Sequence, residues 1–200
     1  MASGQTLLGS HMSTLMTYEE QTEETPFSAE DEAAILQVYL KRAPEKLEKL
    51  AAAEGDAEAF VHLPSAAAAA FHLGRFSEAR EFAKRGLALA PLFHENWNYG
   101  NAIHVGHTVL GLIALNDGDE ITAIAELVAS GETSGSPQLN SFGPTMQLAK
   151  ALLRGGYAEP VLGYLEQCRA FWEMGGVWLS LWERKVRDGS VPNFFQHSHV

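Results

Sequence analysis

The sequence predicts an all-α protein. Alanine, leucine and glutamate are abundant, and apolar residues recur at helical spacing in most segments. No segment alternates apolar and polar residues between turn residues, as a half-buried strand would. The chain has 200 residues, of which 46% are hydrophobic and 20% charged. This suffices for one compact domain with a core, or for a short solenoid, and we expect one helical unit with almost no strand.

The N-terminal part is predicted to lie outside this unit. Residues 9–12, Gly-Ser-His-Met, look like the scar of a cleaved affinity tag, so residues 1–11 are set aside and Met12 is taken as the natural start. Residues 13–32 carry acidic side chains without one Lys or Arg, which predicts a solvated leader. The expected boundaries are a tag remnant and flexible acidic leader at 1–27, one helical domain at 28–187 and a C-terminal tail at 188–200.

The first helices are expected to form a hairpin. Ser28 and Asp31 have the spacing of a capping box, and the apolar positions that follow predict a helix over about 29–42. Pro44 is expected to restart the chain, because proline lacks the N–H that an interior helical position needs. A second helix then runs to Gly55, which can end it with a left-handed cap.

The segment LPSAAAAAFHLGRFSEAREFAKRGLALAP contains a small-residue helix, a glycine–aromatic turn over 74–76, Ala79 in the next helix and a closing Pro91. This order resembles a tetratricopeptide repeat, a helix pair with a 34-residue period, and the period places the unit at about 60–93. Ala67 and Ala79 would then occupy the small positions where the two helices approach closely. The resemblance extends over residues 60–172 and implies antiparallel helix pairs stacked with a right-handed twist around a concave groove, which commonly receives an extended peptide or a helix.

The later repeats are degenerate. The turn recurs over 116–119 and 155–157, but the helix over about 94–115 is overlong and a loop over 130–144 follows it. Pro160 fits only in the first turn of its helix. A last helix over about 176–187 is expected to act as a cap. The predicted fold is therefore a short α-solenoid of antiparallel helix hairpins, similar to tetratricopeptide repeats, with a capping C-terminal helix.

Composition limits the partners. The formal net charge is −11, and residues 86–149 contain no Lys or Arg. Nucleic acid is excluded as a partner, because binding it depends on a basic surface. No membrane partner is expected, since no run of eighteen apolar residues exists, and no signal peptide is seen, so the expected location is the cytoplasm. The single Cys168 rules out an internal disulfide and is expected to pack in the core.

One polar stripe stands out in the overlong helix. Its members, at helical spacing, are Trp97, Asn101, His104, Thr108 and Gly111. Buried amide and imidazole groups need hydrogen-bond partners, and the loop with Asn140 and Phe142 is the natural neighbour. The stripe is then either an internal clamp between helix and loop, which we favour, or a ligand pocket. The candidate ligand- or partner-binding residues are Trp97, Asn101, His104, Thr108, Asn140 and Phe142.

His104 and His107 lie three residues apart on one helical face and could share a metal ion. No further ligand is evident at suitable spacing, and buried neutral histidines more often bond to backbone or hydroxyl groups. We therefore expect packing rather than metal binding, and we expect no cofactor. No catalytic residue is predicted either, because neither a nucleophile–base pair nor a phosphate-binding loop with its lysine is present.

The segments GNAIHVGHTVLG and GSPQLNSFGP also resemble a group of bacterial helical-repeat proteins for which no activity is assigned. The function expected first is a non-enzymatic interaction module that binds a protein or peptide, with an apolar or basic segment preferred, and that can also form a homodimer. The alternative is a small-molecule- or metal-binding protein, or an enzyme, with a pocket between helix 94–115 and loop 130–144.

Overall fold

The computed structural model describes residues 16–25 and 27–200. These residues form ten α-helices and three short 3₁₀ helices and contain no strand, in agreement with the predicted class. The predicted tag remnant and Met12 lie outside the described residues. The helices are α1 (Tyr18–Glu24), α2 (Ala29–Ala51), α3 (Asp56–His72), α4 (Phe76–Leu89), α5 (Tyr99–Asn116), α6 (Glu120–Gly131), α7 (Pro137–Phe142), α8 (Gln147–Arg154), α9 (Ala158–Cys168) and α10 (Gly176–Arg187). The 3₁₀ helices are η1 (Ala90–Phe93), η2 (Glu173–Gly175) and η3 (Phe195–His197).

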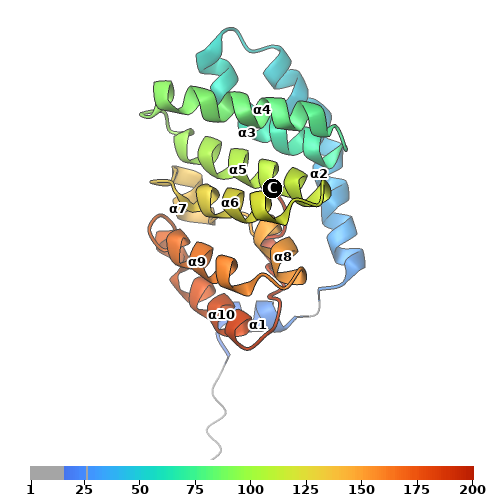
Figure 1. Cartoon of the computed structure of the whole chain (residues 1–200), viewed down its shortest axis with the longest axis vertical. Coiled ribbons are helices and arrows are strands. Elements are labelled where there is room, and N and C mark those ends of the chain that lie inside the picture. Colours follow the sequence, from blue (N-terminus) through green and yellow to red (C-terminus); the bar gives the residue numbers. More distant parts are fainter. Residues whose placement is uncertain (1–15, 26) are drawn as a thin grey trace, which may run out of the picture.

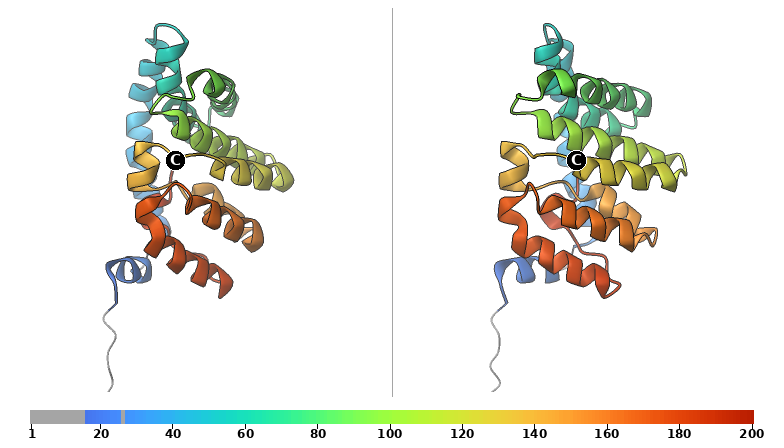
Figure 2. Two further views of the ribbon diagram at one scale, coloured as in Figure 1. Left: turned by 90° about the vertical axis from the view of Figure 1, so that its left-hand side faces the viewer. Right: turned by 60° about the vertical axis from the view of Figure 1, so that its left-hand side comes forward.

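The helices stack in sequence order along the long axis of the molecule, from α3 and α4 through α5 and α6 to α9 and α10 (Figure 1). The long α2 runs lengthwise beside this stack, which Figure 2 shows from two further sides. The three predicted turns separate α3 from α4, α5 from α6, and α8 from α9. Gly74 and Gly118 have positive φ angles of 72° and 76°, which glycine adopts without strain.

The prediction of two helices at the start of the domain is wrong, because α2 is one helix from Ala29 to Ala51 with Pro44 inside it. The predicted capping box is present, since Ser28 Oγ accepts from the N–H of Asp31 at 3.2 Å. Proline removes one hydrogen bond from the helix, but packing on both sides of Pro44 compensates. Ala43 is fully buried, and Leu47 packs against the alanine cluster of α3.

The overlong helix is shorter than predicted and begins at Tyr99 rather than at residue 94. Residues 94–98 form turns, because the Asn98 side chain donates to the carbonyls of Phe60 and Val61 and so ties this segment to α3. The predicted loop over 130–144 contains α7, which Ser136 caps by accepting from the N–H of Leu139 at 3.0 Å. The last helix, α10, has the predicted bounds, and Pro160 lies in the first turn of α9.

The core has two main parts. The first joins the alanine-rich α3 to α4 and α5, and its members Ala67 and Ala79 are both fully buried. These are the two small positions that the repeat pattern predicted, and short side chains there let the helices approach closely. The second part joins α6, α8, α9 and α10 and contains larger side chains, among them Tyr164, Trp182 and Phe194.

Both ends of the described chain pack against the body, which corrects the expectation of a flexible leader for its described residues, 16–25 and 27. Residues 18–24 form α1, which contacts α10 and buries the side chain of Glu23. The tail leaves α10 and runs back to the middle of the stack, where the chain ends (Figures 1 and 2). Phe194 in this tail is fully buried. A second subunit is therefore not needed to cover Trp182 or Phe194.

Candidate functional site

His104, the centre of the predicted stripe, is 1% exposed and has hydrogen bonds at both ring nitrogens. Nε2 accepts from the backbone N–H of Thr145 at 3.1 Å, so the proton lies on Nδ1, which donates to the carbonyl of Ser130 at 3.2 Å. The ring stacks on Tyr164 with centroids 6.5 Å apart. Burial lowers the pKa of His104 to about 4, so its imidazole is neutral near pH 7. His104 therefore joins α5 to α6 and to the segment before α8.

His107 has a separate partner on α6. Its Nδ1 lies 2.7 Å from Glu126 Oε2, and both side chains are about three-quarters buried. The two histidines thus make different contacts although they are three residues apart. The described part of the chain holds no group of three or more His, Cys, Asp or Glu side chains arranged to bind a metal ion.

The loop that contains α7 is clamped directly onto α5. Asn101 is the polar centre of this contact: its Oδ1 accepts from Ser136 Oγ at 2.8 Å, and its Nδ2 donates to Gln138 Oε1 at 3.2 Å. The backbones also meet, since a Cβ added to Gly100 would lie 2.0 Å from the Gly135 carbonyl oxygen. Only glycine allows this approach. The geometry is that of the internal clamp expected between helix and loop.

The other predicted site residues do not converge on one point. Thr108 is 1% exposed and belongs to the packed interior. Asn140, with its amide nitrogen facing Phe171 and Ser136, donates to their carbonyl oxygens at 2.6 and 3.1 Å. Phe142 is 77% exposed. Trp97, at 50% exposure, stands just before α5 on the same side as Asn101.

Trp97 and Asn101 line a cavity of about 580 Å³ between α2, α3, the start of α5 and α7. We call it the α2–α5 cavity. Apolar walls come from α3 and from Val105, and polar groups come from Ser65 on α3 and Gln138 on α7. Lys46 and Lys49 of α2 and the chain end at Val200 also border it. It overlaps the predicted pocket between α5 and the loop, but it extends toward α2 and does not include His104.

The lysines of this cavity were missed by sequence reasoning. Their spacing of three residues places Lys46 and Lys49 on one helical face. The spacing did not point to the cavity, because a helix break at Pro44 leaves the orientation of the segment that carries the two lysines undetermined. The unbroken α2 sets this orientation and brings both lysines to the rim of the cavity.

The two lysines differ in their surroundings. Lys49 pairs with Glu45 at 2.7 Å, and both side chains are more than half exposed. Lys46 is half-buried, with its Nζ 5.5 Å from the centroid of the Tyr39 ring, and none of the described carboxylates lies within ion-pair distance of it. Burial, helped by the nearby Arg42 guanidinium, lowers the pKa of Lys46. Lys46 is therefore a partly desolvated cation that forms no ion pair with the described residues, although the neighbouring Glu45 carboxylate still acts on it through space.

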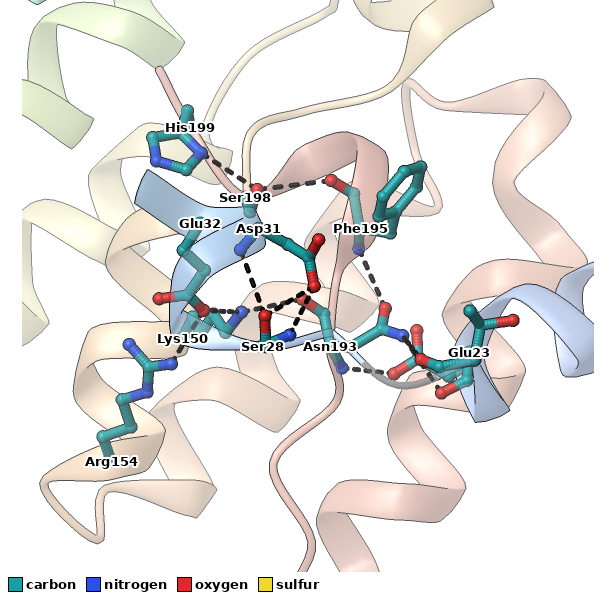
Figure 3. Close-up of polar contacts among 11 residues, drawn as sticks. Glu23, Ser28, Asp31, Glu32, Lys150, Arg154, Asn193, Phe195, Ser198 and His199 are labelled. Atoms are coloured by element: carbon teal, nitrogen blue, oxygen red, sulfur yellow. Dashed lines mark hydrogen bonds and ion pairs between the residues drawn. The ribbon is translucent and has the colours of Figure 1, made fainter. Parts of the chain in front are cut away.

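A second polar cluster, the terminal clasp, joins α1, the start of α2, α8 and the tail (Figure 3). Glu23 is its buried carboxylate, which accepts from Trp182 Nε1 at 3.1 Å and from the backbone N–H of Asn193. Lys150 Nζ donates to Glu32 Oε1 at 2.6 Å and to the Asn193 carbonyl at 2.8 Å. These groups satisfy one another, so the clasp holds the ends of the chain in place.

The only cysteine is not an activated nucleophile. Cys168 is fully buried beside Tyr164, and burial raises the pKa of its thiol. A nucleophilic thiolate needs a lowered pKa and access to substrate. Cys168 therefore serves as a core residue, as predicted, although it is the last residue of α9 and not in the middle of the helix.

Comparison with protein-family models, with curated proteins and with solved structures finds no match for this chain. None of the helices in the described ranges is both long and apolar enough to cross a membrane. The chain is thus defined by its all-helical stack and by the α2–α5 cavity.

Proposed function

We propose that this protein is a non-enzymatic helical-repeat module, similar to tetratricopeptide-repeat proteins, that binds an extended segment of a protein partner in the α2–α5 cavity. The carrying observation is the cavity itself, about 580 Å³ with walls from α2, α3, α5 and α7. Stacked helix pairs commonly bind peptides in grooves of this kind. A location in the cytoplasm belongs to the proposal, since a lone buried cysteine suits a reducing compartment.

The side chains of the cavity suit a peptide. Trp97 is half exposed, and tryptophan supplies much of the binding energy in protein interfaces. Ser65 and Gln138 carry a hydroxyl and an amide that can bond to the backbone of an extended segment. The apolar wall of α3 between them offers a surface for the partner's apolar side chains.

The rival hypothesis of a small-molecule, metal or enzymatic site centred on His104 has less support. Both ring nitrogens of His104 are already bonded to backbone groups, and the ring is excluded from the cavity. A general base must reach the proton that it removes. His104 is buried behind the contact between α5 and the α7 loop, so it cannot reach a substrate unless the core opens.

Selection from a displayed library of random peptides tests the proposal. Ser65→Trp should fill the cavity while keeping the fold, because Ser65 is only partly buried and its hydroxyl bonds locally to the His62 carbonyl. Ser77→Trp, at an exposed position of α4, is the matched control. We expect peptides that bind the unchanged protein and Ser77→Trp but not Ser65→Trp. If no peptide binds Ser77→Trp more tightly than Ser65→Trp, the cavity is not a binding site and the proposal fails.

A further inference from the structure

The side chains that line the α2–α5 cavity carry a charge opposite to that of the whole chain. The formal net charge of the protein is −11, yet the side chains that line the cavity include two lysines and no Asp or Glu. The chain terminus at Val200 adds one carboxylate to the lining, but it forms no ion pair with Lys46. Lys46 has no ion-pair partner among the described residues, whereas Lys49 shares Glu45. An anionic group near Lys46 would meet a cation that has already lost part of its hydration, so the additional desolvation cost would be small.

We propose, resting on the proposed function, that the partner segment is acidic: a carboxylate faces Lys46 at the α2 wall while a neighbouring apolar side chain packs on Trp97. The recognition is a charge-assisted hydrogen bond beside an aromatic anchor. The two groups border one cavity from different elements, since Lys46 comes from α2 and Trp97 precedes α5. A segment that alternates acidic and apolar residues presents both kinds of group.

This inference reverses the preference for an apolar or basic segment that the sequence suggested. That preference rested on residues 86–149, which contain no cation. The cations of the cavity come instead from α2, which the sequence did not connect with this region. Elsewhere the acidic surface repels an acidic partner. The electrostatic field of the protein therefore favours binding at the α2–α5 cavity over binding at other parts of the surface.

Glu45 limits the strength of the site. Its carboxylate lies 2.7 Å from Lys49 Nζ and neutralises the second cation of the α2 wall. Glu45→Gln should free Lys49 and strengthen binding of an acidic peptide. This gain is informative because a variant that merely disturbs the fold would weaken binding.

The test uses two peptide pools that are random except for a central Glu-x-Glu or Lys-x-Lys. Peptides that bind the unchanged protein and not Ser65→Trp are then fluorescein-labelled, and their dissociation constants are measured by anisotropy beside versions with Gln in place of Glu. Lys46→Gln keeps the aliphatic stem and removes the charge. Lys41→Gln, at an exposed position of α2 outside the cavity, is the matched control.

We expect binders from the Glu-x-Glu pool, and Lys46→Gln should weaken them about fivefold, the upper range for a partly exposed ion pair. The Gln versions should bind Lys46→Gln and the unchanged protein equally, and Lys41→Gln should have no effect. Binders that depend on the cavity but prefer Lys-x-Lys, or that do not respond to Lys46→Gln, overturn the acidic preference and leave the proposed function standing. The absence of any binder that depends on the cavity overturns the proposed function itself.

Discussion

The imidazole of His104 bonds to the Ser130 carbonyl of α6 through Nδ1 and to the Thr145 N–H before α8 through Nε2. A neutral ring with the proton on Nδ1 meets both requirements, and a protonated ring would lose the second bond. One side chain thus supplies a donor to one backbone group and an acceptor to another. Its role is structural, and its partners lie 26 and 41 residues away in the sequence.

His104→Ala is expected to lower the free energy of unfolding by about 2–4 kcal/mol. The change leaves the Ser130 carbonyl and the Thr145 N–H without partners and opens a cavity next to Tyr164. Urea denaturation measures the effect, with His94→Ala as control because the His94 side chain is 70% exposed. The control should change stability by less than about 0.5 kcal/mol. Equal effects of the two substitutions would show that the clamp contributes nothing to stability.

At the scale of elements, two contacts between distant segments decide how the helices are arranged. The first is the approach of the α7 loop to α5, where Gly100 meets the Gly135 carbonyl. The second is the terminal clasp, through which Glu23 of α1 holds α10 and the tail. Both contacts bury segments that the sequence alone predicts to be exposed: the loop over 130–144 and the acidic leader.

Gly100→Ala tests the first contact. The added methyl group would overlap the Gly135 carbonyl oxygen, so the loop must move, and we expect a loss of about 1–3 kcal/mol in the free energy of unfolding. Gly163→Ala in α9 is the control, since nothing lies within 4 Å of its added Cβ. There, alanine should stabilise the helix by up to about 1 kcal/mol. A gain in stability from both substitutions would refute the close contact.

Glu23→Ala tests the second contact. It removes the acceptor of the Trp182 indole N–H and of the Asn193 backbone N–H, and we expect a loss of about 2–4 kcal/mol. Glu24→Ala is the neighbouring control, because the Glu24 side chain is 63% exposed in its pair with Lys185. Hydrogen exchange should show faster exchange of α1 amides in Glu23→Ala alone. Unchanged protection of α1 would mean that the clasp does not hold this helix.

At the scale of the whole molecule, buried histidines as well as apolar side chains hold distant segments of the stack together. Burial lowers the pKa of His72, His104, His197 and His199. Three of them bond to backbone carbonyls of segments far away in the sequence, such as Val200 for His72 and Pro144 for His197. The folded protein therefore favours neutral histidines at several junctions between the tail and the helices.

This arrangement predicts that stability falls as the pH is lowered. The pKa of His104 is 6.5 when exposed and about 4 when folded, so between these values the unfolded chain binds more protons than the folded one. Stability must then rise with pH across this window, by up to about 3 kcal/mol from His104 on an order-of-magnitude basis. Urea denaturation between pH 7 and pH 5 measures it, and His104→Ala should show a shallower slope. A slope that is the same in both proteins would contradict the assignment.

Much of the fold was predictable from local pattern. The turns after α3, α5 and α8 and the bounds of α10 follow from glycine positions and helical spacing, and the buried Ala67 and Ala79 follow from the repeat pattern. The continuity of α2 was not predictable, because tertiary packing of Ala43 and Leu47 outweighs the cost of Pro44. The start of α5 was missed because the bonds of Asn98 to α3 are not local.

The candidate site was predictable only in part. The polar stripe correctly indicated that Asn101 and His104 need partners, and the loop supplies two partners of Asn101, Ser136 and Gln138. The sequence placed Asn140 and Phe142 beside the stripe, whereas Asn140 bonds near Phe171 and Phe142 is exposed. Spacing shows which residues share a face, but it does not show which distant segment covers that face.

By itself, the sequence determined the helical class, the main turns and the close helix contacts at alanine, because these depend on backbone preferences and side-chain size within a few residues. Only the tertiary structure decided that α2 is continuous, that His104 is buried behind the contact between α5 and the α7 loop, and that Lys46 and Trp97 line one cavity. Those outcomes depend on burial and hydrogen bonding between segments far apart in the chain. The free energies of these long-range contacts exceed the local conformational preferences on which an interpretation of the sequence depends.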